Sequence, residues 1–294
     1  MSFGVLGPLE VREPGGAEVR VGTGKPAALL SALLVHANAW VSVDELIAMI
    51  WQEQDVPPSA ERNLKTYVWR LRRALPAPAA GPRIESTARA YRIRVDPGEL
   101  DVDEAQRLFE AAGRTGDPEA AAGLLTEALR LWRGRPYGGT GWAAPAVGFA
   151  EQLHRRIRNR LADLYAGTGR HDEAAVLARA LVTEDPLRED SWTRLVLALH
   201  HGGRRAEALE AFESARAVLL AELGVEPGPA LAAAHRRVLR GDRPGGAPGD
   251  LARIEDLLVG AVRAIETAVR LADRIGVTVP ALPALPVAVG GVPA

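Results

Sequence analysis

The spacing of hydrophobic residues changes character near residue 100. Before that point, short stretches of alternating apolar and polar residues surround three segments whose apolar residues recur every three or four positions. Alternation with period two is typical of strands, and the three-to-four spacing is typical of helices. After residue 100 the helical spacing continues with almost no strand-like runs. The pattern predicts an α+β domain over residues 1–97, followed by an all-α domain over residues 100–241.

The first domain begins with strand-like sequence. Residues 3–11 and 18–21 lie on either side of a Pro-Gly-Gly turn, so we expect a short antiparallel sheet. Residues 26–36 and 43–51 then have the spacing of two helices. Ser42 stands at the N-cap of the second helix, with a glutamate three residues into it, which is the pattern of a capping box.

The third helical segment, residues 59–75, is amphipathic, and Ser59 stands at its N-cap. Its apolar residues share one face, which is suited to a core. The rest of its surface carries polar, aromatic and basic side chains, namely Arg62, Lys65, Thr66, Trp69, Arg70 and Arg73. Guanidinium groups match phosphate oxygens and guanine edges in pairs of hydrogen bonds. We interpret this segment as a DNA-recognition helix; the alternative is a basic face that only contacts water.

A hairpin is predicted next, after a proline-rich break. Its strands are residues 83–86 and 91–95, and in the second strand apolar residues alternate with arginines. Between residues 59 and 94 nine basic residues face two acidic ones, a local net charge of +7 in a chain whose total is −1. A basic helix followed by an arginine-bearing hairpin indicates a winged helix. The predicted DNA contacts are Arg62, Lys65, Thr66, Trp69, Arg70 and Arg73 in the helix, Arg89 and Arg92 in the hairpin, and Lys25 at the start of the first helix.

The helical half contains a repeat. Gly169-Arg170-His171-Asp172-Glu173-Ala174 recurs as Gly203-Arg204-Arg205-Ala206-Glu207-Ala208, an offset of 34 residues, which is the tetratricopeptide period. Helix pairs of this kind stack into a superhelix that binds other chains. Residues 230–239 read as a capping helix.

Three further segments are expected beyond the repeats. Residues 242–250 have the composition of a linker, and residues 251–276 have apolar residues at heptad spacing. This heptad helix either joins two copies into a homodimer or folds back on the repeats. Residues 277–294 are interrupted by prolines, so we expect a disordered tail and no membrane helix.

Composition removes several functional classes. The chain has no cysteine, which excludes disulfides, thiolate metal sites and cysteine nucleophiles. Its 6 histidines lack the spacing of metal sites such as HExxH, so we expect no metal, no cofactor and no catalytic residue. The N-terminal sequence has no basic segment or cleavage signature for export. We therefore expect a cytoplasmic protein associated with the nucleoid.

Six sequence blocks, in this order, resemble the Streptomyces antibiotic regulatory protein family of transcriptional activators, over roughly residues 1–241. They are FGVLGPLEV (3–11), VSVDELIAMIW (41–51), TYVWRLRRAL (66–75), ALRLWRGRPY (128–137), PLREDSWTRLVLALHHGGRRAEAL (186–209) and ELGVEPGPAL (222–231). The resemblance implies an OmpR-like winged helix joined to a bacterial transcriptional activation domain. It also implies binding to direct repeats in promoter DNA, usually as a dimer, recruitment of RNA polymerase, and control of genes for secondary metabolism.

The chain departs from the family pattern at three positions. Ala27 stands where the family has a basic residue, Ala90 replaces a glycine before the tyrosine of the wing, and Trp69 replaces a residue that is usually small and polar. These departures motivate an alternative function, a tetratricopeptide-like adaptor whose DNA-binding domain is degenerate. An adaptor would show only weak, sequence-blind association with DNA.

Overall fold

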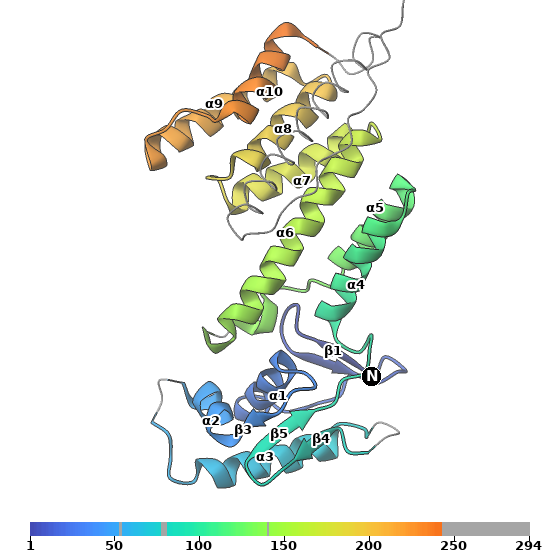
Figure 1. Ribbon diagram of the computed structural model, residues 1–294, viewed down its shortest axis with the longest axis vertical. Helices are drawn as coiled ribbons and strands as arrows, with labels where there is room; N and C mark the ends of the chain where they lie inside the picture. Colours follow the sequence, from blue (N-terminus) through green and yellow to red (C-terminus); the bar gives the residue numbers. More distant parts are fainter. Residues whose placement is uncertain (53–54, 78–80, 140, 243–294) are drawn as a thin grey trace, which may run out of the picture. The chain divides into compact units, whose positions relative to one another are not determined.

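The computed structural model describes residues 1–52, 55–77, 81–139 and 141–242 (Figure 1). Contacts divide the chain into two units, Met1–Arg240 and Gly241–Ala294, and the description below concerns the first. The predicted heptad helix, the proline-rich tail and all of the predicted linker except its first residue lie outside the described residues.

The chain begins with a two-stranded antiparallel sheet. Strand β1 (Ser2–Gly4) pairs with β2 (Glu10–Arg12). The prediction of one strand over residues 3–11 was therefore wrong, because Gly7 and Pro8 turn the chain and proline supplies no N–H for a ladder. The second predicted strand, residues 18–21, contributes a single bridge from Glu18 to Arg12.

Three helices follow, α1 (Lys25–Val35), α2 (Val43–Trp51) and α3 (Ala60–Ala74), and each lies within one residue of its predicted bounds. The capping box of α2 is confirmed: the Glu45 N–H donates to Ser42 Oγ at 3.2 Å, and the Ser42 N–H donates to Glu45 Oε2 at 2.9 Å. Ser59 does occupy the N-cap position of α3, but its side chain caps no backbone group. Its Oγ instead accepts from Asn63 Nδ2 at 3.2 Å.

The predicted hairpin is confirmed as β4 (Ile84–Ser86) and β5 (Ala90–Ile93). A third strand, β3 (Val41–Ser42), pairs with β5 and gives an antiparallel sheet of order β3-β5-β4. No periodicity could reveal β3, because it has only 2 residues. Tyr91 and Ile93 are buried in the apolar core, so Arg92 between them lies on the other face of β5.

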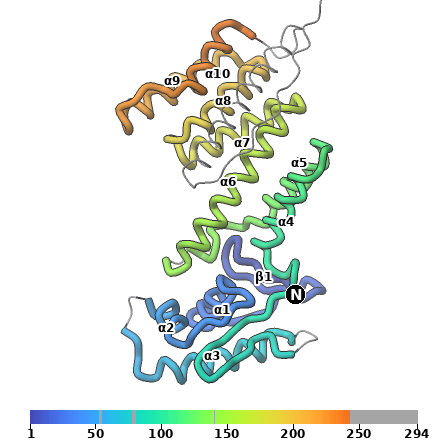
Figure 2. The backbone as a smooth tube through the Cα atoms, in the orientation of Figure 1, coloured from blue at the N-terminus to red at the C-terminus, as the bar shows by residue number. Residues whose placement is uncertain are grey.

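The second half of the described chain is helical, as predicted. The helices are α4 (Asp101–Arg114), α5 (Pro118–Leu129), α6 (Ala144–Gly167), α7 (His171–Glu184), α8 (Glu189–His201), α9 (Arg205–Leu223) and α10 (Pro229–Arg240). Helices α4 and α5 lie side by side (Figure 2). Helices α7 and α9 begin 34 residues apart, at His171 and Arg205. Two 3₁₀ turns, η1 (Pro136–Gly139) and η2 (Gly141–Ala143), precede α6.

The apolar core does not stop at the end of the winged helix. One cluster of buried residues runs from Phe3 in β1 to Leu161 in α6, and a second runs from Ala174 in α7 to Val238 in α10. The first three helices of the helical half therefore share a core with the winged helix. Burial of apolar surface, the main stabilising term in folding, acts across this junction.

Candidate nucleic-acid interface

Helix α3 presents the residues that the sequence selected. Ala60, Leu64, Val68 and Leu71 are buried, which fixes the rotation of the helix about its own axis. The opposite side is consequently turned to solvent, and all six predicted contacts on this helix are exposed: Arg62, Lys65, Thr66, Trp69, Arg70 and Arg73. This exposed surface, the α3 face, carries four cationic side chains and one large aromatic ring.

Trp69 and Arg73 form a pair on the α3 face. The Trp69 side chain is 55% exposed, and the Arg73 guanidinium carbon lies 4.9 Å from the centre of its ring. A cation over an aromatic face is attracted by the ring quadrupole, and the pair is worth about 0.5–1 kcal/mol at an exposed site. The pair presents a flat apolar surface beside a positive charge, which suits a sugar or a thymine methyl next to a phosphate.

Lys65 and Thr66 have partners on the helix itself. Lys65 Nζ lies 2.8 Å from Glu61 Oε1, and this hydrogen bond raises the pKa of Lys65, so its amine stays charged. Both side chains are at least 60% exposed, which makes the pair weak and easily exchanged for a phosphate. The Thr66 hydroxyl donates to the Arg62 carbonyl at 3.2 Å, and its oxygen can still accept a second hydrogen bond.

The turn of the β4–β5 hairpin, the wing, carries Arg89. Its side chain is 79% exposed and its Nη2 lies 3.2 Å from Asp44 Oδ2 on α2. Asp44 is 77% exposed, so water screens this ion pair and it contributes little to stability. Arg89 can therefore leave Asp44 for a stronger anion at small cost.

Arg92 and Lys25 each have two kinds of partner within the protein. The Arg92 guanidinium lies 4.6 Å from the centre of the Trp40 ring and forms an ion pair with Glu85. Lys25 Nζ donates to the Ile50 carbonyl at the end of α2, at 2.7 Å, and lies 5.2 Å from the centre of the Trp51 ring. Contact with DNA by either residue stays a prediction and requires it to give up these partners.

Two arginines counted in the local charge hold the winged helix together. Arg72 Nε donates to the Ile84 carbonyl at 2.9 Å, and its Nη2 donates to Ser86 Oγ at 3.0 Å, which joins α3 to β4. Arg83 is only 5% exposed and forms an ion pair with Glu99 at 2.6 Å. One feature of the sequence could have indicated the structural role of Arg72. It follows buried Val68 by one helical turn, so it lies at the edge of the apolar face.

Within the described residues, no group of three or more histidine and acidic side chains is arranged to hold a metal ion. No helix in the same part of the chain combines the length and the apolar surface needed to cross a membrane.

Comparison with known proteins bears on this interface. The family model "Transcriptional regulatory protein, C terminal" matches residues 17–91, and "Bacterial transcriptional activator domain" matches residues 100–239. Regulatory protein DnrI of Streptomyces peucetius is 34% identical over 258 residues, which cover 82% of this chain and 93% of DnrI. The chain belongs to the Streptomyces antibiotic regulatory protein family. The resemblance inferred from the six sequence blocks is thereby confirmed.

The match covers only part of some relatives. Regulatory protein AfsR of Streptomyces griseus is 35% identical over 257 residues, and the match covers 85% of this chain but only 26% of AfsR. The chain thus spans about a quarter of the length of that relative. The solved structure of Mycobacterium tuberculosis EmbR in complex with a low-affinity phosphopeptide is 28% identical, with a TM-score of 0.75 over 90% of this chain and 70% of the EmbR chain. This likeness confirms the predicted fold class, a winged helix followed by tetratricopeptide-like helices.

Proposed function

We propose that this protein is a sequence-specific DNA-binding activator of transcription, without a reaction of its own. The α3 face would enter the major groove, and Arg89 would lie over the neighbouring backbone. Arg70, Arg73 and Thr66 would read base edges, and Lys65 would neutralise a phosphate. The observation that carries the proposal is the exposure of every predicted contact on α3, while the apolar residues Ala60, Leu64, Val68 and Leu71 of the same helix are buried.

Family membership supports a set of partners. We infer that the protein binds direct repeats in promoter DNA, as a homodimer, and recruits RNA polymerase through its helical domain. The genes it controls would belong to a pathway of secondary metabolism. Such a protein acts in the cytoplasm, at the nucleoid. The local net charge of +7 over residues 59–94, in a chain whose total is −1, supports this assignment, because a positive segment attracts phosphate.

Footprinting of the full chain on DNA upstream of its own and neighbouring genes tests the proposal. Protection of a defined site is expected. Arg70→Ala should relax specificity at one position of the site and cost about 1–3 kcal/mol of binding free energy. Arg89→Ala should weaken binding to all sequences and lower the salt dependence by roughly one unit of slope. Arg114→Ala, an exposed change on α4, is the matched control and should leave binding unaltered. A protected site that ignores both substitutions would refute the interface.

A second function keeps some support from the contacts of Lys25 and Arg92. Both bind other parts of the protein, and Ala27 and Ala90 depart from the family pattern. These features favour an adaptor with a degenerate DNA-binding domain. The same footprinting decides between the two functions, because an adaptor would protect no defined site and would lose its weak binding as salt rises.

A further inference from the structure

The turn between β1 and β2 is held by a loop from the helical half of the chain, the segment between α5 and α6. Three backbone hydrogen bonds join them: the Arg133 N–H donates to the Leu6 carbonyl at 2.7 Å, the Tyr137 N–H donates to the Val5 carbonyl at 2.7 Å, and the Gly138 N–H donates to the Gly7 carbonyl at 3.2 Å. The loop thus pairs with the turn much as a strand would, although more than 100 residues separate them.

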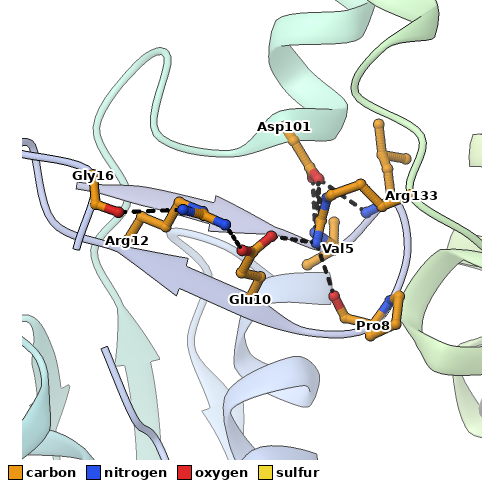
Figure 3. A network of polar contacts seen from close by, with 8 residues as sticks. Val5, Pro8, Glu10, Arg12, Gly16, Asp101 and Arg133 are labelled. Atoms are coloured by element: carbon orange, nitrogen blue, oxygen red, sulfur yellow. Dashed lines mark hydrogen bonds and ion pairs between the residues drawn. The ribbon is translucent and has the colours of Figure 1, made fainter. Parts of the chain in front are cut away.

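The Arg133 side chain adds a second set of bonds (Figure 3). Its Nη1 donates to the Pro8 carbonyl at 3.2 Å and to Glu10 Oε2 at 2.7 Å, and its Nη2 donates to Asp101 Oδ2 at 3.1 Å. Asp101 is the first residue of α4, and its carboxylate accepts from the Val5 N–H at 2.9 Å and the Leu6 N–H at 3.0 Å. One guanidinium therefore joins the β1–β2 sheet, the start of α4 and the α5–α6 loop.

Two glycines leave room for Arg133. A Cβ atom added at Gly4 would lie 2.7 Å from Arg133 Cζ and closer still to Nη2, well inside van der Waals contact. A Cβ atom added at Gly7 would lie 3.0 Å from Arg133 Cβ and 3.1 Å from its carbonyl carbon. A larger residue at Gly4 would push the guanidinium off its partners, because the clash is with the flexible end of the side chain.

The carboxylates of this set are partly shielded from water, whereas Arg133 lies at the surface. The Arg133, Glu10 and Asp101 side chains are 31%, 24% and 11% exposed. Burial also raises the pKa of Asp101, so its carboxylate depends on the backbone N–H groups and on Arg133 to remain charged. Together with the apolar core that runs from β1 into α6, these bonds join the winged helix to α4–α6.

We propose that Arg133 is a positioning residue: it locks the winged helix onto α4–α6, so that DNA bound by α3 also fixes where the helical domain stands on the promoter. The inference rests on the proposed function. Among the described residues, the Arg133 side chain bonds to Pro8, Glu10 and Asp101, which lie outside the α3 face. The lock should therefore govern transcription activation rather than affinity for one DNA site. The bonds of the lock lie between the β1–β2 sheet, the start of α4 and the α5–α6 loop.

The test compares full-length Arg133→Met with Arg135→Met, an exposed arginine two residues along the same loop. Amide hydrogen exchange reports on the lock directly. In Arg133→Met the amides of Val5 and Leu6 should exchange on the order of tenfold faster, since their acceptor Asp101 is no longer held. Affinity for a duplex with a single site should change by less than about twofold, while transcription from a template with the footprinted promoter should fall by roughly tenfold or more, the range of a typical coupling energy. Arg135→Met should match the parent protein in all three assays.

A second variant guards against a simple folding defect. Gly4→Ala in the parent protein should reproduce the faster exchange and the loss of transcription, because the new methyl displaces the guanidinium. In the Arg133→Met background, Gly4→Ala should cause no further change in exchange or transcription, since the guanidinium that the new methyl would displace is already absent. Full additivity of the two substitutions would overturn the lock.

The remaining outcomes are equally decisive. Unchanged exchange at Val5 and Leu6 in Arg133→Met refutes the inference, and so does a loss of single-site affinity as large as the loss of transcription. If the parent protein recognises no defined DNA site, the proposed function fails instead. The exchange measurements and the pairing of Gly4→Ala with Arg133→Met still decide whether the lock exists.

Discussion

Neighbouring arginines on α3 should respond in opposite ways to the same substitution. Arg73 belongs to the α3 face, whereas Arg72 bonds to the hairpin. Methionine removes the charge of each residue and keeps most of the aliphatic stem and the helix propensity. The comparison separates a residue that contacts DNA from a residue that only supports the fold.

The magnitudes follow from the contacts. Arg72→Met loses two hydrogen bonds, to the Ile84 carbonyl and to Ser86 Oγ, and should cost about 1–3 kcal/mol of unfolding free energy at about 0.5–1.5 kcal/mol each. The melting temperature should fall by roughly 2–6 °C. Arg73→Met loses only the exposed contact with Trp69, worth less than about 1 kcal/mol.

DNA binding should show the reverse order. Besides its proposed contact with a base edge, Arg73 brings one positive charge close to the phosphates. Arg73→Met removes that charge, so the slope of log K against log salt should become shallower by about 0.9. Arg72→Met, measured where it is fully folded, should keep the parent slope. Urea unfolding and salt titrations of a fluorescent duplex provide both quantities. The reasoning is refuted if Arg72→Met flattens the salt slope as much as Arg73→Met does while leaving stability intact.

Two further predictions concern stability. Burial, with the Arg158 charge nearby, lowers the pKa of His154 from 6.5 to about 4, so the unfolded chain binds a proton in this range before the folded one does. The contribution of neutral His154 to the free energy of unfolding should be complete above pH 6.5 and should be lost as the pH drops from 6.5 towards 4. In urea titrations between about pH 7 and pH 5, His154→Gln should therefore show a smaller loss of stability than the parent protein. In the same assay Ser42→Ala, which breaks the capping box of α2, should cost about 1 kcal/mol. Ser59→Ala should cost less than about 0.5 kcal/mol, because that side chain caps no backbone group; equal losses for the two serines would contradict the capping argument.

Much of the candidate interface could be predicted from local spacing. The rotation of α3 follows from the positions of Leu64, Val68 and Leu71, and that rotation alone exposes Arg62, Trp69 and Arg73. The hairpin and the 34-residue repeat were equally visible, because each is produced by short-range hydrogen bonding and a regular apolar pattern. The first strand was wrongly extended because its alternation continues through the Gly7-Pro8 turn.

The roles of individual arginines needed the tertiary structure. Composition counted Arg72, Arg83 and Arg92 with the DNA-facing charge, yet each is engaged by Ile84, Glu99 or Trp40. A side chain's partners across the fold depend on where distant segments pack, and no local period encodes that.

The sequence by itself determined the fold class of each half of the chain, the exposed face of α3 and the six blocks that resemble the family. The tertiary structure decided that two of those blocks, FGVLGPLEV and ALRLWRGRPY, meet at Arg133 and Asp101. Secondary structure repeats at short range and leaves a period in the sequence. The contact between Pro8 and Arg133, 125 positions apart, leaves no period, so the sequence cannot distinguish Arg133 from the arginines beside it.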